Sequence, residues 1–126
     1  MIGVIVADDN APMRSAINEI VEAYPARIIA EAANGFDAVR AAEHEEPDLV
    51  VLDISMPVMN GLVATQHIRA LYRDVPIIMI TEHSEMAFRA EAYRCGALGY
   101  VLKGRASIDL PAAISSVIAG RRYTSI

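Results

Sequence analysis

Several short apolar runs in this chain end at residues that could take part in phosphoryl or metal chemistry. Asp8 and Asp9 follow one run, Asp53 follows another, and Thr81 and Lys103 follow two more. Neighbouring carboxylates repel one another, and a hard divalent cation such as Mg²⁺ relieves that repulsion. A carboxylate can also attack a phosphoryl group and form an acyl phosphate, which a hydroxyl and an ammonium group can stabilise. Each residue alone could be a helix cap, a turn residue or an exposed charge, so the prediction depends on their lying together.

The elements that would bring these residues together can be read from the apolar pattern. Short runs rich in Val and Ile predict buried strands at residues 2–7, 27–32, 49–52, 77–80 and 98–102. Apolarity in these runs is nearly continuous rather than alternating, which favours a parallel sheet covered on both faces.

Helical patterns lie between and after the runs, at residues 13–24, 36–45, 61–72, 85–94 and 110–118. The alternation predicts one domain, residues 1–126, with a five-stranded parallel sheet in a doubly wound, flavodoxin-like (βα)5 sandwich. The carboxyl ends of parallel strands share one edge, where such folds bind ligands. We therefore expect the polar residues named above to meet at that edge.

Composition limits the other classes of function. The chain has 126 residues, is 54% hydrophobic and carries a net charge of −5, so it can form a core and is poorly suited to bind nucleic acid directly. The pair Arg121–Arg122 is too small for a basic patch.

A lone Cys95 excludes an intrachain disulfide and suits a reducing compartment. With no secretory leader or membrane-spanning run, we expect a cytoplasmic protein that does not contact membranes. The three scattered histidines predict no histidine-based metal site.

Four motifs carry a resemblance to a known family. They are VADDN at residues 6–10, LDISMPVMNG at 52–61, the Ile-Thr pair at 80–81 and GALGYVLKG at 96–104. With these motifs the chain resembles, over essentially its whole length, the receiver domain of bacterial two-component response regulators. The second motif would form a tight turn near the phosphate, in which Gly61 adopts φ values that other residues resist.

The resemblance implies a role for each residue of the site. Asp53 would accept a phosphoryl group from a histidine kinase. Asp9 and Asp53 would bind Mg²⁺ directly together with the backbone carbonyl of Ser55, and Asp8 would act through water. The reaction would be self-catalysed phosphotransfer followed by slow autodephosphorylation, so the protein would not be an enzyme with a turnover substrate.

The resemblance also implies a conformational readout. Thr81 and Lys103 would contact the phosphoryl oxygens, and Tyr100 would be the switch residue that turns inward when Thr81 moves. Homodimerisation on phosphorylation would follow. Glu82 stands where a small residue is usual in the family, and we expect it to affect access to Asp53 and the rate of phosphorylation.

The last residues, LPAAISSVIAGRRYTSI, resemble the final helix of the subfamily whose members carry a C-terminal helix-turn-helix DNA-binding domain. A linker would begin after the Gly-x-x-Tyr motif. DNA would be bound only through an effector domain that these residues do not contain, and control of transcription is the implied output.

Other functions remain open on sequence alone. One is a stand-alone receiver that acts by protein–protein interaction. Another is a phosphatase with an aspartyl-phosphate intermediate, although such enzymes place a second Asp where this chain has Ser55. A flavin-binding module would need a phosphate loop rich in Ser, Thr or Gly after the first strand, and the sequence there is DDNAPM. A receiver-like scaffold that is never phosphorylated is the last alternative.

Overall fold

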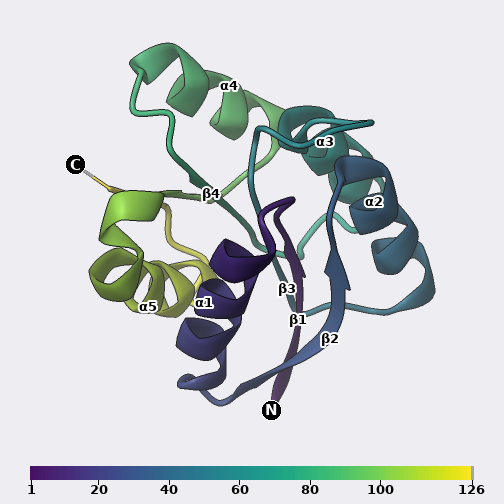
Figure 1. Ribbon diagram of the computed structural model, residues 1–126, viewed down its shortest axis with the longest axis horizontal. Coiled ribbons are helices and arrows are strands. Elements are labelled where there is room, and N and C mark those ends of the chain that lie inside the picture. The colour runs from purple at the N-terminus through teal and green to yellow at the C-terminus, as the bar shows by residue number, and fades with distance from the viewer. Residues whose placement is uncertain (126) are drawn as a thin grey trace.

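Buried aliphatic residues build the strands of one parallel sheet, as seen in a computed structural model that describes residues 1–125. The strands are β1 (Ile2–Ala7), β2 (Ala26–Ala32), β3 (Leu49–Leu52), β4 (Ile77–Thr81), β5 (Gly99–Leu102) and β6 (Tyr123–Thr124). All neighbours pair in parallel, in the order β2-β1-β3-β4-β5-β6. Figure 1 labels the first four strands, β1 to β4. The doubly wound α/β fold expected from the sequence is confirmed.

The helices begin at the edge where the strands end. They are α1 (Ala11–Glu22), α2 (Gly35–His44), α3 (Gly61–Leu71), α4 (Met86–Cys95) and α5 (Ala106–Ile118), with a 3₁₀ turn η1 (Lys103–Arg105) before the last. Asn10, Asn34 and Asn60 cap the first three helices, each accepting a backbone N–H bond from the third residue after it. Asparagine satisfies the free N–H groups of a first turn, so these caps hold the connecting loops at the sheet edge.

The two faces of the sheet have separate cores. One apolar cluster packs the sheet against α2, α3 and α4, and includes Ile5, Leu52, Met79 and Tyr100. The other packs the opposite face against α1 and α5, and Figure 1 shows these two helices together on that side. Successive strand residues alternate between the clusters, which explains the continuous apolar runs.

The expectation of five strands was wrong, because the residues after α5 form a sixth. Helix α5 ends at Ile118, and Gly120, which follows the cap residue Ala119, has a φ of +82°. The backbone N–H of Gly120 bonds to the carbonyl of Val117 and that of Arg121 to Ser116, the pattern of a Schellman cap. The chain then reverses and pairs with β5 at Gly99 and Tyr100. Thr124, which follows the Gly-x-x-Tyr motif where a linker was expected to begin, is therefore part of the sheet.

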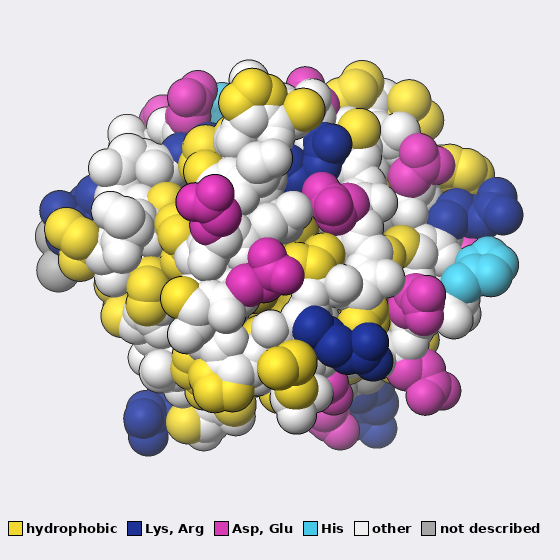
Figure 2. All heavy atoms as spheres, turned by 60° about the horizontal axis from the view of Figure 1, so that its bottom comes forward, with side chains coloured by type: hydrophobic (Ala, Val, Ile, Leu, Met, Phe, Trp, Pro, Cys, Tyr) yellow, Lys and Arg dark blue, Asp and Glu magenta, His cyan; other side chains and the backbone are white. Residues whose placement is uncertain are grey.

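Surface properties agree with the acidic composition. On the face shown in Figure 2, Lys and Arg side chains are dispersed among acidic and hydrophobic ones. Within residues 1–125, none of the helices is both long and apolar enough to cross a membrane.

Candidate functional site

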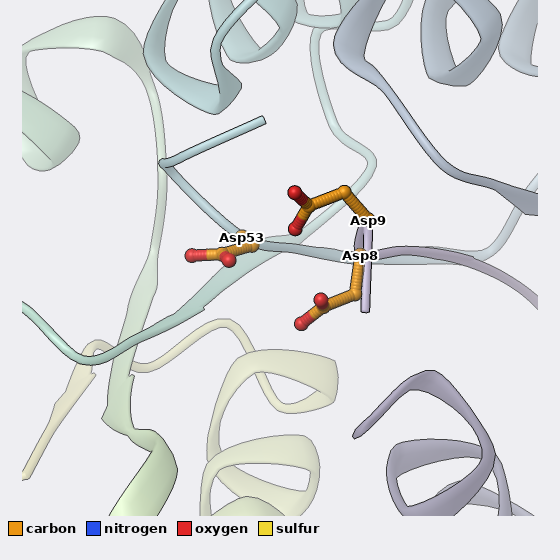
Figure 3. Close-up of side chains that lie close together, drawn as sticks. All are labelled: Asp8, Asp9 and Asp53. Carbon is orange, nitrogen blue, oxygen red and sulfur yellow. The ribbon is translucent and has the colours of Figure 1, made fainter. Parts of the chain in front are cut away.

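Two neighbouring strands place three aspartates at the carboxyl edge of the sheet. Asp8 and Asp9 directly follow β1, and Asp53 directly follows β3. Because Ala7 pairs with Leu52 in the parallel register, the residues that come next are neighbours. One carboxylate oxygen from each aspartate lies within 4.8 Å of the other two, and Figure 3 shows the three side chains grouped at the strand ends. Asp8 and Asp53 are buried, whereas Asp9 is exposed.

The Asp53 carboxylate is held from two sides. Its Oδ1 accepts a 2.7 Å hydrogen bond from the backbone N–H of Ile54, and its Oδ2 accepts one of 2.8 Å from Lys103 Nζ. A charge that is 96% buried needs such partners, since desolvation costs several kcal/mol. The side chain therefore has a fixed orientation at the base of the cleft.

Lys103 joins two of the aspartates. Its ammonium lies 2.8 Å from Asp53 Oδ2 and 2.9 Å from Asp8 Oδ2. Burial alone would lower the pKa of Lys103, but the hydrogen bond to Asp53 and the negative charges of Asp53 and Asp8 outweigh it, so the pKa is raised. Lys103 is the only lysine in the chain. It stays protonated and offsets one of three clustered negative charges.

The cluster suits a hard divalent cation. Three carboxylates face one another with a single ammonium to balance them. The approach of Lys103 to Asp8 Oδ2 is an ion pair without hydrogen-bond geometry, so this buried oxygen has no hydrogen-bond donor within the described residues. Carboxylate oxygens in this arrangement match the donor set that Mg²⁺ prefers.

Thr81 and Lys103 share a small pocket with Asp53. The pocket has a volume of about 150 Å³ and is lined by Asp53, Ser55, Thr81, Glu82, His83 and Lys103. Thr81 is fully buried at the end of β4, and its hydroxyl accepts a 3.3 Å hydrogen bond from the backbone N–H of His83. A larger cleft of about 620 Å³ continues toward Pro12, Met13 and Ala16 of α1. Glu82 lines both spaces.

Gly61 follows the loop between β3 and α3, and the positive φ predicted for this glycine was wrong. The φ of Gly61 is not positive, and in this loop the positive φ of 69° belongs to the exposed Val58. A Cβ atom at Gly61 would lie 1.8 Å from the backbone oxygen of Asp53. Glycine is needed here because α3 begins in direct contact with the backbone of Asp53.

Tyr100, the residue predicted to act as a switch, points inward from β5. The side chain is fully buried, and its hydroxyl donates a 2.7 Å hydrogen bond to the carbonyl oxygen of His83. Burial raises the pKa of Tyr100 to about 12. The tyrosine thereby connects β5 to the loop that follows Thr81.

Three contacts at or near the site were not predicted from the sequence. The Ser55 hydroxyl and His83 Nε2 are 2.8 Å apart and join the loops after β3 and β4. Arg14 Nη1 donates to the carbonyl oxygen of Asp8 at 2.7 Å, and its Nε pairs with Glu31 of β2. The only sequence signal for the first contact was the position of His83, two residues after Thr81.

Comparison with known proteins places this geometry in a family. The model of the response regulator receiver domain matches residues 4–115. UvrY of Escherichia coli K12, a response regulator, is 40% identical over 124 residues, which are 98% of this chain and 57% of UvrY. GacA of Pseudomonas aeruginosa, also a response regulator, is 32% identical over 99% of this chain and 59% of its own length. The chain thus spans somewhat more than half the length of these relatives.

Solved structures give the same result. A LuxR-family two-component response regulator from Aurantimonas superposes with a TM-score of 0.92 at 34% identity, covering 98% of this chain and 89% of that one. The receiver domain of a NarL regulator from Mycobacterium tuberculosis gives a TM-score of 0.88 at 26% identity, covering 95% and 98%. Together with the clustered aspartates, these matches show that the chain belongs to the response regulator receiver domain family and is a receiver of two-component signalling.

Proposed function

We propose that this receiver domain accepts a phosphoryl group on Asp53 from the phosphohistidine of a histidine kinase. The observation that carries the proposal is the Asp53 carboxylate itself. It is buried at the base of the cleft, bonded to Lys103, and grouped with Asp8 and Asp9. The matched family and relatives supply the reaction class.

The transfer balances without a further reactant. A carboxylate oxygen of Asp53 bonds to phosphorus while the phosphorus–nitrogen bond of phosphohistidine breaks, and the electron pair stays on the imidazole nitrogen. Lys103 and the Thr81 hydroxyl line the pocket next to Asp53, where both can donate to phosphoryl oxygens. Hydrolysis of the resulting acyl phosphate resets the protein, so it catalyses reactions of its own side chain only.

Mg²⁺ is the cation that the site fits. Asp9 and Asp53 would hold it through their carboxylates and Ser55 through its backbone carbonyl, with Asp8 acting through water. When bound, it supplies positive charge that offsets the phosphoryl oxygens. Lys103 pairs with both Asp8 and Asp53, so this lysine balances part of the negative charge of the cluster.

The proposed consequence is a shift between two conformations. Thr81 and Tyr100 are connected through the loop after β4, because both bond to the backbone of His83. Movement of the Thr81 hydroxyl toward a phosphoryl group would therefore shift His83 and alter the position of the Tyr100 side chain. A population shift of this kind requires the modification to favour one state, as a charged acyl phosphate beside Lys103 would. We propose two outputs, homodimerisation and control of an effector domain. That effector domain would bind DNA and control transcription. The protein would act in the cytoplasm.

The competing functions find less support. An aspartyl-phosphate phosphatase needs an acid/base two residues after the nucleophile, where Ser55 instead contacts His83. A flavin module needs a phosphate-binding loop after β1, where Asp8 and Asp9 present negative charge. An unphosphorylated scaffold would not need an acceptor, an acidic cluster and a lysine in one cleft.

Intact mass after incubation with Mg²⁺ and acetyl phosphate tests the proposal. The wild type should gain one phosphoryl group, and Asp53→Asn should gain none. Asp74→Asn, which changes an exposed aspartate, is the matched control and should behave like the wild type. A wild type that stays unmodified with acetyl phosphate and with a cognate kinase would contradict the proposed function.

A further inference from the structure

The segment of residues 121–125, here called the docked tail, lies along the outer edge of β5, the strand that carries Tyr100. Its Tyr123 N–H donates to the carbonyl of Leu98 at 3.1 Å, and its Ser125 N–H donates to that of Tyr100 at 2.8 Å. The Ser125 hydroxyl accepts from the N–H of Leu102 at 3.1 Å. These bonds satisfy the outer edge of β5, which a five-stranded receiver would leave open.

Asp109 of α5 anchors the docked tail from below. This carboxylate is 95% buried and accepts hydrogen bonds from the Ser125 hydroxyl at 2.6 Å, the Tyr123 hydroxyl at 2.8 Å and Arg105 Nε at 2.9 Å. A buried carboxylate is costly unless its donors are in place. Two of the three donors come from the tail, so Asp109 is satisfied only when the tail is docked.

Arg89 of α4 contacts both Tyr100 and the docked tail. Its guanidinium carbon lies 5.3 Å from the centre of the Tyr100 ring. The same guanidinium donates to the Thr124 hydroxyl at 2.8 Å and to the Ser125 carbonyl. Tyr93 of α4 adds a hydrogen bond from its hydroxyl to the carbonyl of Tyr123. Arg89 therefore contacts the Tyr100 ring and the tail at the same time, so an outward turn of Tyr100 would disturb the contacts that hold the tail.

We propose that the docked tail is an intramolecular ligand of the switch, which binds only while Tyr100 is turned inward. The inference rests on the proposed function, because it takes the inward position of Tyr100 to be the one that phosphorylation of Asp53 favours. Docking of the tail and phosphorylation then stabilise the same state. By thermodynamic linkage, each must strengthen the other by the same factor.

The coupling gives the tail a role in output. β6 runs parallel to β5, so its C-terminal end lies at the carboxyl edge of the sheet, where Arg89 of α4 contacts the tail. The relatives UvrY and GacA are longer than the region that matches this chain. In a protein where a further segment follows the tail, the phosphorylation state of Asp53 would control how firmly the start of that segment is held.

Amide hydrogen exchange with and without beryllofluoride, a phosphoryl mimic, tests the coupling. In the 126-residue chain with Mg²⁺, saturating beryllofluoride should slow exchange at Tyr123 and Ser125 by about tenfold. Ser125→Ala removes the hydroxyl that bonds Asp109 and Leu102 and should weaken beryllofluoride binding by a similar factor. Arg89→Met tests the same coupling from α4 and should have the same effect.

Ser115→Ala is the matched control, since it removes an exposed hydroxyl of α5 away from the tail. It should bind beryllofluoride as the wild type does. Equal exchange at Tyr123 and Ser125 in both states, while the Lys103 amide responds to beryllofluoride, would overturn the coupling and leave the proposed function standing. A wild type with no response at Lys103 or elsewhere would overturn both.

Discussion

The ammonium of Lys103 lies 2.8 Å from Asp53 Oδ2, so the proposed acceptor is already paired with the cation that would contact its phosphoryl group. The same ammonium reaches Asp8. The site is therefore preorganised. The Lys103 ammonium can exchange its hydrogen bond to the Asp53 oxygen for one to a phosphoryl oxygen without a large movement. Preorganised charge of this kind costs little reorganisation during reaction.

Loss of this pairing should destabilise the fold in a way that Mg²⁺ partly reverses. Lys103→Met leaves Asp8 and Asp53 buried without their cation, which should lower the free energy of unfolding by about 3 kcal/mol. A divalent cation would take over the charge balance, so added Mg²⁺ should restore more stability in the variant than in the wild type. Urea unfolding with and without Mg²⁺ measures both effects.

The control for this prediction is Arg40→Met. Arg40 is exposed, and its ion pair with Glu43 is long, at 4.0 Å. Its loss should therefore lower the free energy of unfolding by less than about 0.5 kcal/mol, and this loss should not depend on Mg²⁺. A Lys103→Met penalty that is identical at all Mg²⁺ concentrations would show that the ammonium and the cation do not share the acidic cluster.

Glu82 should slow phosphorylation by anionic donors. Glu82 lines both the small pocket at Asp53 and the larger cleft, so its negative charge should repel an incoming phosphate. Glu82→Gln keeps the shape and removes the charge, and it should raise the rate with acetyl phosphate by about threefold at low salt. The gain should shrink at high ionic strength because exposed charges are screened. Equal rates for both proteins at low salt would rule out this electrostatic effect.

Much of the site followed from local sequence. Each apolar run is its own signal for a strand, and parallel topology then places Asp8, Asp53, Thr81 and Lys103 at one edge without any long-range information. The importance of Gly61 was also predicted, but for the wrong reason. Its requirement arises from contact with the Asp53 backbone, a relationship between two loops that no dihedral preference reveals.

The sixth strand could not be predicted in the same way. Tyr123 and Thr124 form no apolar run, and a strand of two residues is held by its neighbours rather than by its own propensity. Its main anchor, Asp109, reads in sequence as a surface charge near the start of a helix. The hydrogen bond between Ser55 and His83 likewise joins residues 28 positions apart, with only a histidine in a polar loop as a local hint.

The contact made by Gly61 should make it far less tolerant than Gly104. A Cβ at Gly61 would overlap the backbone oxygen of Asp53 at 1.8 Å, and backbone cannot move aside cheaply. Gly61→Ala should therefore lower the free energy of unfolding by about 3 kcal/mol and slow phosphorylation by displacing Asp53. Gly104→Ala, where nothing lies within 4 Å of the new Cβ, should be nearly neutral. Urea unfolding of both variants decides this, and similar losses at the two positions would contradict it.

Acid should weaken the attachment of the docked tail through Asp109. Hydrogen bonding from Ser125, with further bonds from Arg105 and Tyr123, lowers the pKa of Asp109 below its ordinary 3.8. A carboxyl group with a lowered pKa in the folded state adds stability that is fully present well above pH 4. That stability is lost as the pH falls through 3.8 and further toward the folded pKa.

Asp109→Asn removes this titration, so the stability difference between wild type and variant should be largest near neutral pH and should narrow as the pH falls below about 4. Urea unfolding at a series of pH values measures the difference, and Asp74→Asn, which changes an exposed aspartate, should show no such narrowing. A difference between wild type and Asp109→Asn that stays constant from pH 7 to pH 3 would mean that the hydrogen bonds from Ser125 and Tyr123 do not depend on the charge of Asp109. In that case the tail would be held by its backbone pairing with β5 and by its bonds to Arg89 and Tyr93, without a contribution from the charge of Asp109.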